Sequence, residues 1–233
     1  MKGIAMFNHV EVEALPELKT KTIDGKRHYV ISEDRCYPSV TTVMSKLPEK
    51  VKGLQEWRNR VGDKEADRVS KEARERGTKV HQMIENHLNN ADIHTNLKQY
   101  PIQNLYPSMG MFKSIEPHLN KYVDNIYAQE VPLYSDHLEL AGRCDCIAEF
   151  DGELAIIDFK TSSKTKKYEW LSDYFMQECA YSIMWEERTG QGIGMLVTII
   201  TVQDSPAQIF CEHRDRWVQP LKDAINNYST LVE

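Results

Sequence analysis

Three residues that could do chemistry together lie in one short segment, residues 141–161. They are Asp145, Asp158 and Lys160. Side chains alternate between the two faces of a strand, so Asp158 and Lys160, two residues apart, would share a face. Carboxylates supply the hard oxygen ligands that Mg²⁺ and Mn²⁺ prefer. A lysine beside them could orient or activate a water, or stabilise charge on a phosphate. These residue types therefore predict a divalent-metal site.

A hairpin would place the two carboxylates opposite each other. The dipeptide Asp-Gly at 151–152 favours a two-residue type I′ turn, because both of its central positions need positive φ. With that turn, Phe150 pairs with Glu153, and Asp145 sits opposite Asp158. Directly opposed Cβ atoms lie roughly 4.5–5.5 Å apart, where like charges repel. A bound metal ion would offset that repulsion.

The alternative is an edge hairpin whose charges are solvated, with a local Asp–Lys pair. The run Leu154–Ile157 argues against it, because it reads as a central strand buried on both faces. Charges that end such a strand are costly unless they are paired or bound to metal.

The same residues resemble the signature of the PD-(D/E)XK nuclease superfamily, an Asp followed by Asp-x-Lys. Two further matches, upstream and downstream, resemble the Gly-x-x-x-His and Gln-x-x-x-Tyr motifs of its RecB-like branch. Two more segments are similar to the mitochondrial genome maintenance exonuclease group and its phage relatives. The Gly-x-x-x-His match is Gly77–His81, and the Gln-x-x-x-Tyr match is Gln177–Tyr181. The two segments similar to the exonuclease group are Tyr37–Thr41 and Glu130–Tyr134. The resemblance covers roughly residues 35 to 230.

This resemblance implies a site and a reaction. Asp145, Asp158 and His81 would bind Mg²⁺ or Mn²⁺ together with the main-chain carbonyl of Phe159, and Lys160 would position the attacking water. The reaction would be hydrolysis of phosphodiester bonds in single-stranded DNA from free ends, in DNA repair or recombination. In relatives, helices over the active site form a passage for one strand. Residues 39–90 and 90–127 could build it here.

Several of these positions keep an ordinary structural interpretation beside the functional one. His81 could be a core histidine rather than a metal ligand. Gln177 and Tyr181 share one helical face, and could either orient the site and touch a phosphate or simply pack on the sheet. Glu85 and Glu130 could support the metal site or be ordinary charges.

Five residues are candidates for binding the DNA backbone. Ser39 and Thr41 could contact a phosphate at a helix N-terminus, or only cap that helix. The lysines could steer the backbone into the site because they follow the strand of Asp158, or could merely solvate a loop. These lysines are Lys164, Lys166 and Lys167.

Bulk composition limits the class of protein. The 233 residues are 41% hydrophobic and 27% charged, typical of a globular chain, and contain no apolar run of the ~20 residues that a bilayer span needs. Net charge is −6, yet residues 1–90 hold 17 Lys/Arg against 14 Asp/Glu, so the basic excess lies in the N-terminal part. The first residues turn acidic and lack a leader pattern, which predicts a bacterial or phage-infected cytoplasm. Five cysteines, without a Cys-x-x-Cys pair near the C-terminus, predict core residues rather than an iron–sulfur cluster.

The predicted fold is α/β, a restriction-endonuclease-like mixed sheet flanked by helices, with an N-terminal helical region. We expect one nuclease domain over residues 1–233, mainly helical in 1–90 and with the sheet-containing catalytic core in 128–233. Predicted helices are 40–46, 54–61, 63–89 interrupted at Gly77, 111–127, 170–188 and 213–228. Predicted strands are 130–135, 142–150, 154–160 and 195–202, with a small hairpin at 20–31.

The sequence favours a monomeric exonuclease without membrane association, but two rivals stay open. One is an endonuclease of the same fold that cuts flaps or junctions. The other is a DNA-binding module without activity, which would have no need of a lysine beside paired carboxylates.

Overall fold

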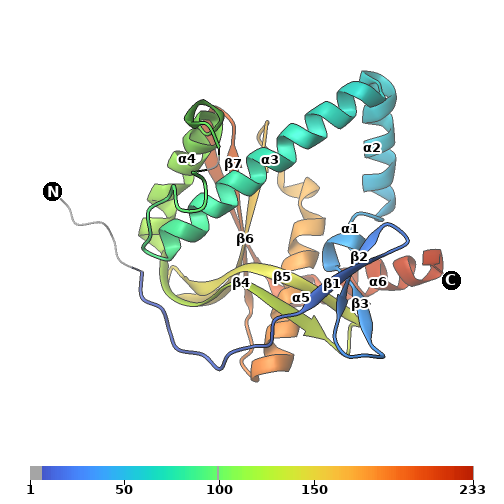
Figure 1. Cartoon of the computed structure of the whole chain (residues 1–233). Coiled ribbons are helices and arrows are strands. Elements are labelled where there is room, and N and C mark those ends of the chain that lie inside the picture. Colours follow the sequence, from blue (N-terminus) through green and yellow to red (C-terminus); the bar gives the residue numbers. More distant parts are fainter. Residues whose placement is uncertain (1–6, 99, 233) are drawn as a thin grey trace.

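A five-stranded mixed sheet forms the centre of the molecule (Figure 1). The structure is a computed structural model that describes residues 7–98 and 100–232. The expectation about the N-terminal segment falls partly on residues 1–6, outside this part. The strand order is β4-β5-β6-β7-β8, with β6 and β7 parallel and the other neighbours antiparallel. The strands are β4 (Val123–Ser135), β5 (Leu140–Phe150), β6 (Glu153–Ser162), β7 (Met195–Val202) and β8 (Ser205–His213). The predicted restriction-endonuclease-like mixed sheet is confirmed.

Helices cover both faces of this sheet (Figure 1). One buried core joins the sheet to α3 and α4, and a second joins it to α1, α5 and α6. Apolar side chains at helical spacing, such as Met111, Ile115 and Leu119 of α4, supply the faces that are buried. The helices are α1 (Val40–Met44), α2 (Pro48–Val61), α3 (Asp63–Leu88), α4 (Tyr106–Tyr122), α5 (Ser172–Thr189) and α6 (Val218–Val232).

A small three-stranded sheet lies beside the main body near α1 and α6. It contains β1 (Lys19–Ile23), β2 (Lys26–Val30) and β3 (Cys36–Pro38). Asp24 and Gly25 both have positive φ, 49° and 71°, as the tight turn between β1 and β2 requires. The hairpin predicted at 20–31 is confirmed, and the third strand carries the chain to Ser39, the N-cap of α1.

The helical part 48–88 differs from the prediction in two places. The helix expected at 54–61 is α2, which already begins at Pro48, because a proline at the first helical position loses no hydrogen bond. Gly77 does not interrupt α3, which runs unbroken through 26 residues. A single glycine costs a helix only about 1 kcal/mol. The helical turns on either side of Gly77 offset that cost.

Two predicted boundaries on the sheet side are also wrong. The helix expected at 111–127 is α4, which starts five residues earlier and ends at Tyr122, and β4 takes over at Val123. The helix expected at 213–228 is α6, which begins at Val218, and residues 205–213 form the edge strand β8, which was not predicted. Every residue of β8 is half-buried or exposed, as befits an edge strand, and this weak pattern hid the strand.

No helix among the described residues combines the length and the hydropathy that crossing a bilayer requires.

Candidate active site

The two predicted carboxylates lie where β5 separates from β6. Pairing follows the predicted register from Phe150 and Glu153 to Cys146 and Ile157, and then stops. Beyond that point the backbone N–H of Phe159 donates to Oδ2 of Asp145 over 2.9 Å. A side-chain carboxylate thus replaces the carbonyl that a continued ladder would offer. The separation of the strands is what fixes the carboxylate of Asp145 beside β6.

Near Asp145 on β5 and Glu130 on β4, the side chains of each strand switch from one face of the sheet to the other. Cys144 packs in the core on the side of α5, whereas Cys146 packs in the core on the side of α3 and α4. Strand alternation would place two residues at this spacing on one face, so the two cysteines depart from it. Pairing between β4 and β5 keeps one register on both sides of the switch, so Glu130 faces Asp145. Glu130 has φ 46°, a left-handed conformation that costs a non-glycine residue about 1 kcal/mol. Strain of this kind collects at functional positions.

His81, Glu130 and Asp145 form a compact group. One ligand atom from each lies within 4.8 Å of the others. His81, on α3, places Nδ1 3.6 Å from Oδ2 of Asp145. Burial, together with the charges of Asp145 and Glu85, raises the pKa of Glu130 to about 7. An imidazole and two carboxylates are donors that suit Mg²⁺ or Mn²⁺, and a cation would relieve the repulsion that raises this pKa. The donor set therefore fits a divalent ion.

Asp158 belongs to an adjoining network instead. Its carboxylate is 1% exposed, pairs with the ammonium of Lys160, and accepts a hydrogen bond from Nε2 of Gln177 over 3.0 Å. The amide of Gln177 also donates to the hydroxyl of Tyr181 over 3.4 Å. The ammonium of Lys160 lies 3.5 Å from Oε1 of Gln177 and 5.1 Å from the centre of the Tyr174 ring. The structure thus brings Asp158, Lys160, Gln177 and Tyr181 together. Spacing alone predicted the two pairs, Asp158 with Lys160 and Gln177 with Tyr181, but not that the pairs meet.

Electrostatics keep Lys160 charged while making Asp158 easy to protonate. Burial disfavours an ammonium, but the charges of Asp158 and Asp145 outweigh it and raise the pKa of Lys160. Burial raises the pKa of Asp158 to about 6, even though Lys160 acts to lower it. Near neutral pH the pair is therefore an ammonium beside a carboxylate that has little margin before it takes up a proton.

Gly142 makes room for the ring of Tyr181. A Cβ atom at Gly142 would lie 2.6 Å from Cε1 of Tyr181, closer than carbon atoms pack, and the ring itself is buried. Gly142→Ala should therefore destabilise the fold by about 1–3 kcal/mol, because the ring must shift in a filled core. Chemical denaturation measures this. Gly110→Ala in α4 is the control, since nothing lies near that position and alanine favours the helix. Equal stability of both variants would contradict the packing argument.

Glu178 is a buried carboxyl that the sequence analysis missed. It is fully buried next to Gln177, and the hydroxyl of Thr198 on β7 hydrogen-bonds to its Oε1. Burial and then the charge of Asp158 raise the pKa of Glu178 well above its usual range. Its surroundings therefore favour the neutral form of the carboxyl. Its position directly after Gln177 was visible in the sequence, but nothing there distinguished it from a solvated glutamate.

A cavity of about 450 Å³ opens onto these groups. His81, Glu130, Asp145 and Lys160 line it, and so does Glu85, whereas Asp158 lies behind the surface. Polar residues absent from the sequence prediction complete the wall: Arg27, Thr78, Gln82 and Arg143. Arg143 stands two residues before Asp145 on β5, and its spacing could have suggested it. Arg27 comes from a distant strand, so no local pattern could.

The predicted DNA contacts divide into two groups. Thr41 lines the cavity. Ser39 is buried, and its hydroxyl accepts from the N–H of Thr42 as the cap of α1, the structural interpretation that the sequence left open. The lysines of the loop after β6 do not line the cavity, and this loop is tied to the edge strand β8 through the backbone of Lys166 and the amide of Gln208. They are Lys164, Lys166 and Lys167.

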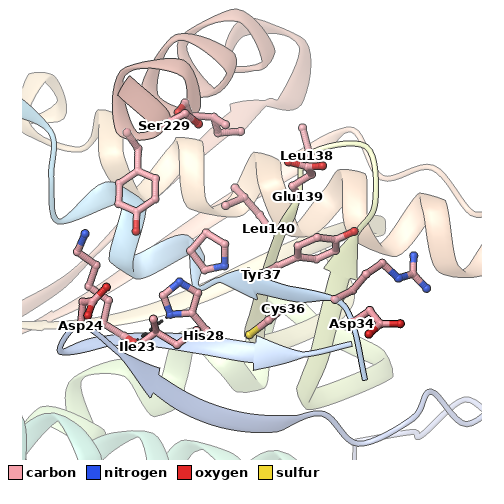
Figure 2. A pocket seen from close by; sticks show the side chains of 15 residues that line it. Ile23, Asp24, His28, Asp34, Cys36, Tyr37, Leu138, Glu139, Leu140 and Ser229 are labelled. Carbon is pink, nitrogen blue, oxygen red and sulfur yellow. Dashed lines mark hydrogen bonds between the residues drawn. The ribbon is translucent and has the colours of Figure 1, made fainter. Parts of the chain in front are cut away.

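A second cavity, of about 460 Å³, lies on the other side of the small sheet (Figure 2). His28, Cys36 and Tyr37 line it from that sheet, together with Leu140 and with Ser229 of α6. None of the clustered carboxylates reaches it. Size alone therefore does not distinguish the two cavities, whereas the grouped donors His81, Glu130 and Asp145 lie on the wall of the first one.

Comparison with known proteins agrees with this geometry. The sequence profile of the PD-(D/E)XK nuclease superfamily matches residues 49–228, most of the chain. The chain belongs to this superfamily. Nucleases of the superfamily generally use divalent metal ions, and the group of His81, Glu130 and Asp145 is where this nuclease has suitable donors.

Two curated relatives share part of the sequence with this nuclease. Mitochondrial genome maintenance exonuclease 1 of Mus musculus is 27% identical over 135 residues, and that of Homo sapiens is 31% identical over 137 residues. These matches cover 55% and 56% of this chain but only 38% of each relative. Among solved structures, a candidate exonuclease from Eubacterium rectale has a TM-score of 0.51 at 15% identity, over 81% of this chain and 77% of that one. That likeness supports the fold.

Proposed function

We propose that this nuclease is a divalent-metal-dependent deoxyribonuclease that degrades single-stranded DNA from free ends. One observation carries the proposal: the donor atoms of His81, Glu130 and Asp145 gather beside the charged Lys160 in a single cavity. The names of the two curated relatives support exonuclease action.

The roles that we propose follow from the contacts. His81, Glu130 and Asp145 would hold the metal ion, with Asp158 and the carbonyl of Phe159 as further oxygen donors beside them. A divalent ion there would supply Lewis-acid stabilisation of the charge that develops on the phosphate.

The remaining chemistry belongs to the side chains around Lys160. Its ammonium would hold the attacking water and oppose the negative charge of the phosphate. Gln177 bridges Asp158, Lys160 and Tyr181, so it would fix the direction of the ammonium. Tyr181 would in turn keep the amide of Gln177 from rotating. Glu85, on the cavity wall, and the buried Glu178, next to Gln177, would support this arrangement.

The preference for a single strand with an end rests on the helices α2 and α3. They extend from the body as an arm (Figure 1), and α2 has no buried residue. The arm returns to the body at Gly77, which lies against Thr161 at the end of β6. At its other end, Lys50 of α2 pairs with the buried Asp173 of α5. A segment anchored at both ends could enclose one strand, and an enclosed strand must enter by its end.

Linear single strands should therefore be degraded while covalently closed circles of the same sequence stay intact. The measurement follows product length over time for both substrates with Mg²⁺ or with Mn²⁺. A linear duplex of the same sequence shows the preference for a single strand. If circles and linear strands are cut equally, the enclosure is wrong and a flap or junction endonuclease becomes the better proposal. If no DNA is cut with either metal ion, the DNA-binding module remains.

A further inference from the structure

Arg27 is one of three cationic side chains, with Arg143 and Lys160, in a cavity that also holds three carboxylates. It lines the same wall as Thr41, in the cavity that also holds Asp145 and Lys160. In the part of the chain that the structure describes, its guanidinium makes no ion pair. It donates to the hydroxyl of Thr41 over 3.0 Å and lies 5.7 Å from the centre of the Tyr29 ring. The arginine is thus held in place without having its charge neutralised.

The backbone of Arg27 is fixed as firmly as its side chain. Its carbonyl accepts from the N–H of Ser39 over 3.0 Å and from the hydroxyl of Thr42 over 3.3 Å. Ser39 also bridges to Ala141 of β5, so the end of the small sheet is attached to the strand that carries Asp145. These contacts set Arg27 at a constant place relative to the carboxylates.

Strand alternation explains why Arg27 enters this cavity while its neighbours do not. Lys26 and His28 line the second cavity, on the opposite face of β2. Figure 2 shows His28 there. Arg27 and Tyr29 take the other face. Of the three consecutive basic residues, Arg27 is therefore the one that enters the cavity of Asp145. Among the described residues it forms no ion pair there.

We propose that Arg27, together with Thr41, binds a backbone phosphate of the DNA strand next to the phosphate that is cut. A planar guanidinium and a hydroxyl both match phosphate oxygens, and arginine is suited to this because it stays charged. The clustered carboxylates would otherwise repel the strand on this side of the cavity. The inference rests on the proposed function, because it names how that site grips its substrate.

The test is a set of single-stranded oligonucleotides, each with one neutral methylphosphonate linkage at a different position. Affinity is measured by fluorescence anisotropy with Ca²⁺ in place of Mg²⁺ or Mn²⁺, for the wild type and for Arg27→Met. The wild type should lose on the order of tenfold in affinity at one linkage beside the cut site. Arg27→Met should bind the unmodified strand about that much more weakly and lose nothing further at that linkage. Its salt dependence should also be shallower, by about 0.7 in the slope of log K against log salt.

Arg35→Met is the matched control, because Arg35 is an exposed arginine near the same small sheet that pairs with Asp136 over 2.8 Å and lines the other cavity. It should behave as wild type. If Arg27→Met fails to fold, Arg27→Gln and Thr41→Val take its place with the same oligonucleotides. A variant that still loses affinity at the same linkage as wild type overturns the inference. If the wild-type protein binds and cuts no DNA at all, the proposed function itself fails.

Discussion

Lys160→Ala is expected to lower the rate of DNA cleavage by on the order of 10²-fold or more, while the fold and DNA binding persist. The ammonium is the cation nearest to Asp158, and its other neighbours, Gln177 and Tyr174, carry no charge. Without it, nothing in the network opposes the charge of a phosphate or holds a water by a positive group. Gel assays of an end-labelled strand give the rate.

The same variant should alter the pH dependence of whatever activity remains. Lys160 acts to lower the pKa of Asp158, which burial has already raised to about 6. Removing the lysine raises that pKa further, so Asp158 would be protonated at neutral pH and residual cleavage should increase as pH rises. Lys164→Ala, in the exposed loop beyond β6, is the control and should cut normally. Activity of Lys160→Ala within a few-fold of wild type would reject the role.

Asp145→Asn should weaken the binding of Mn²⁺ by roughly 10- to 100-fold or more. Losing a residue that only supports a metal ligand already has an effect of that size, and Asp145 is proposed as a ligand itself. Asparagine keeps an oxygen that can accept from the N–H of Phe159, so the separated strands should stay in place. It removes the negative charge that faces Glu130, so the metal-free protein should become more stable. Calorimetric titration and thermal melting without metal measure the two effects.

Two further variants sharpen this test. Asp151→Asn changes a carboxylate in the turn of the same hairpin, where asparagine tolerates the positive φ of 51°, and should bind Mn²⁺ as wild type does. Asp158→Asn should weaken binding less than Asp145→Asn, because Asp158 is engaged by Lys160 and Gln177. Unchanged affinity of Asp145→Asn would place any metal ion elsewhere.

The sequence predicted those parts of the site that depend on one hairpin or one helix. The turn at 151–152 determines the register between β5 and β6, and spacing along single elements joins Asp158 to Lys160 and Gln177 to Tyr181. Such relations are local, so the pattern of residues contains them.

The missing parts depend on contacts between segments far apart in the chain. Glu130 faces Asp145 because the register between β4 and β5 places the two residues opposite each other, and neither strand alone reveals that register. Arg27 reaches the cavity through a sheet whose position is set by Ser39 and Ala141. For a similar reason β8 escaped prediction, because an edge strand with half-buried residues has a weak pattern of its own.

The unbroken course of α3 gives the molecule a mechanical property. Its 26 residues make a rod about 39 Å long. Apart from Ala66, its buried residues all lie in the C-terminal part, from Lys79 on. His81 therefore sits near the pivot of a stiff lever whose far end continues into α2, the other half of the arm. A hinge at Gly77 would have let the arm move on its own, but a continuous rod transmits any tilt of the arm to the imidazole. A DNA strand that entered the space beneath the arm and tilted α3 would therefore also shift the imidazole of His81 relative to Asp145.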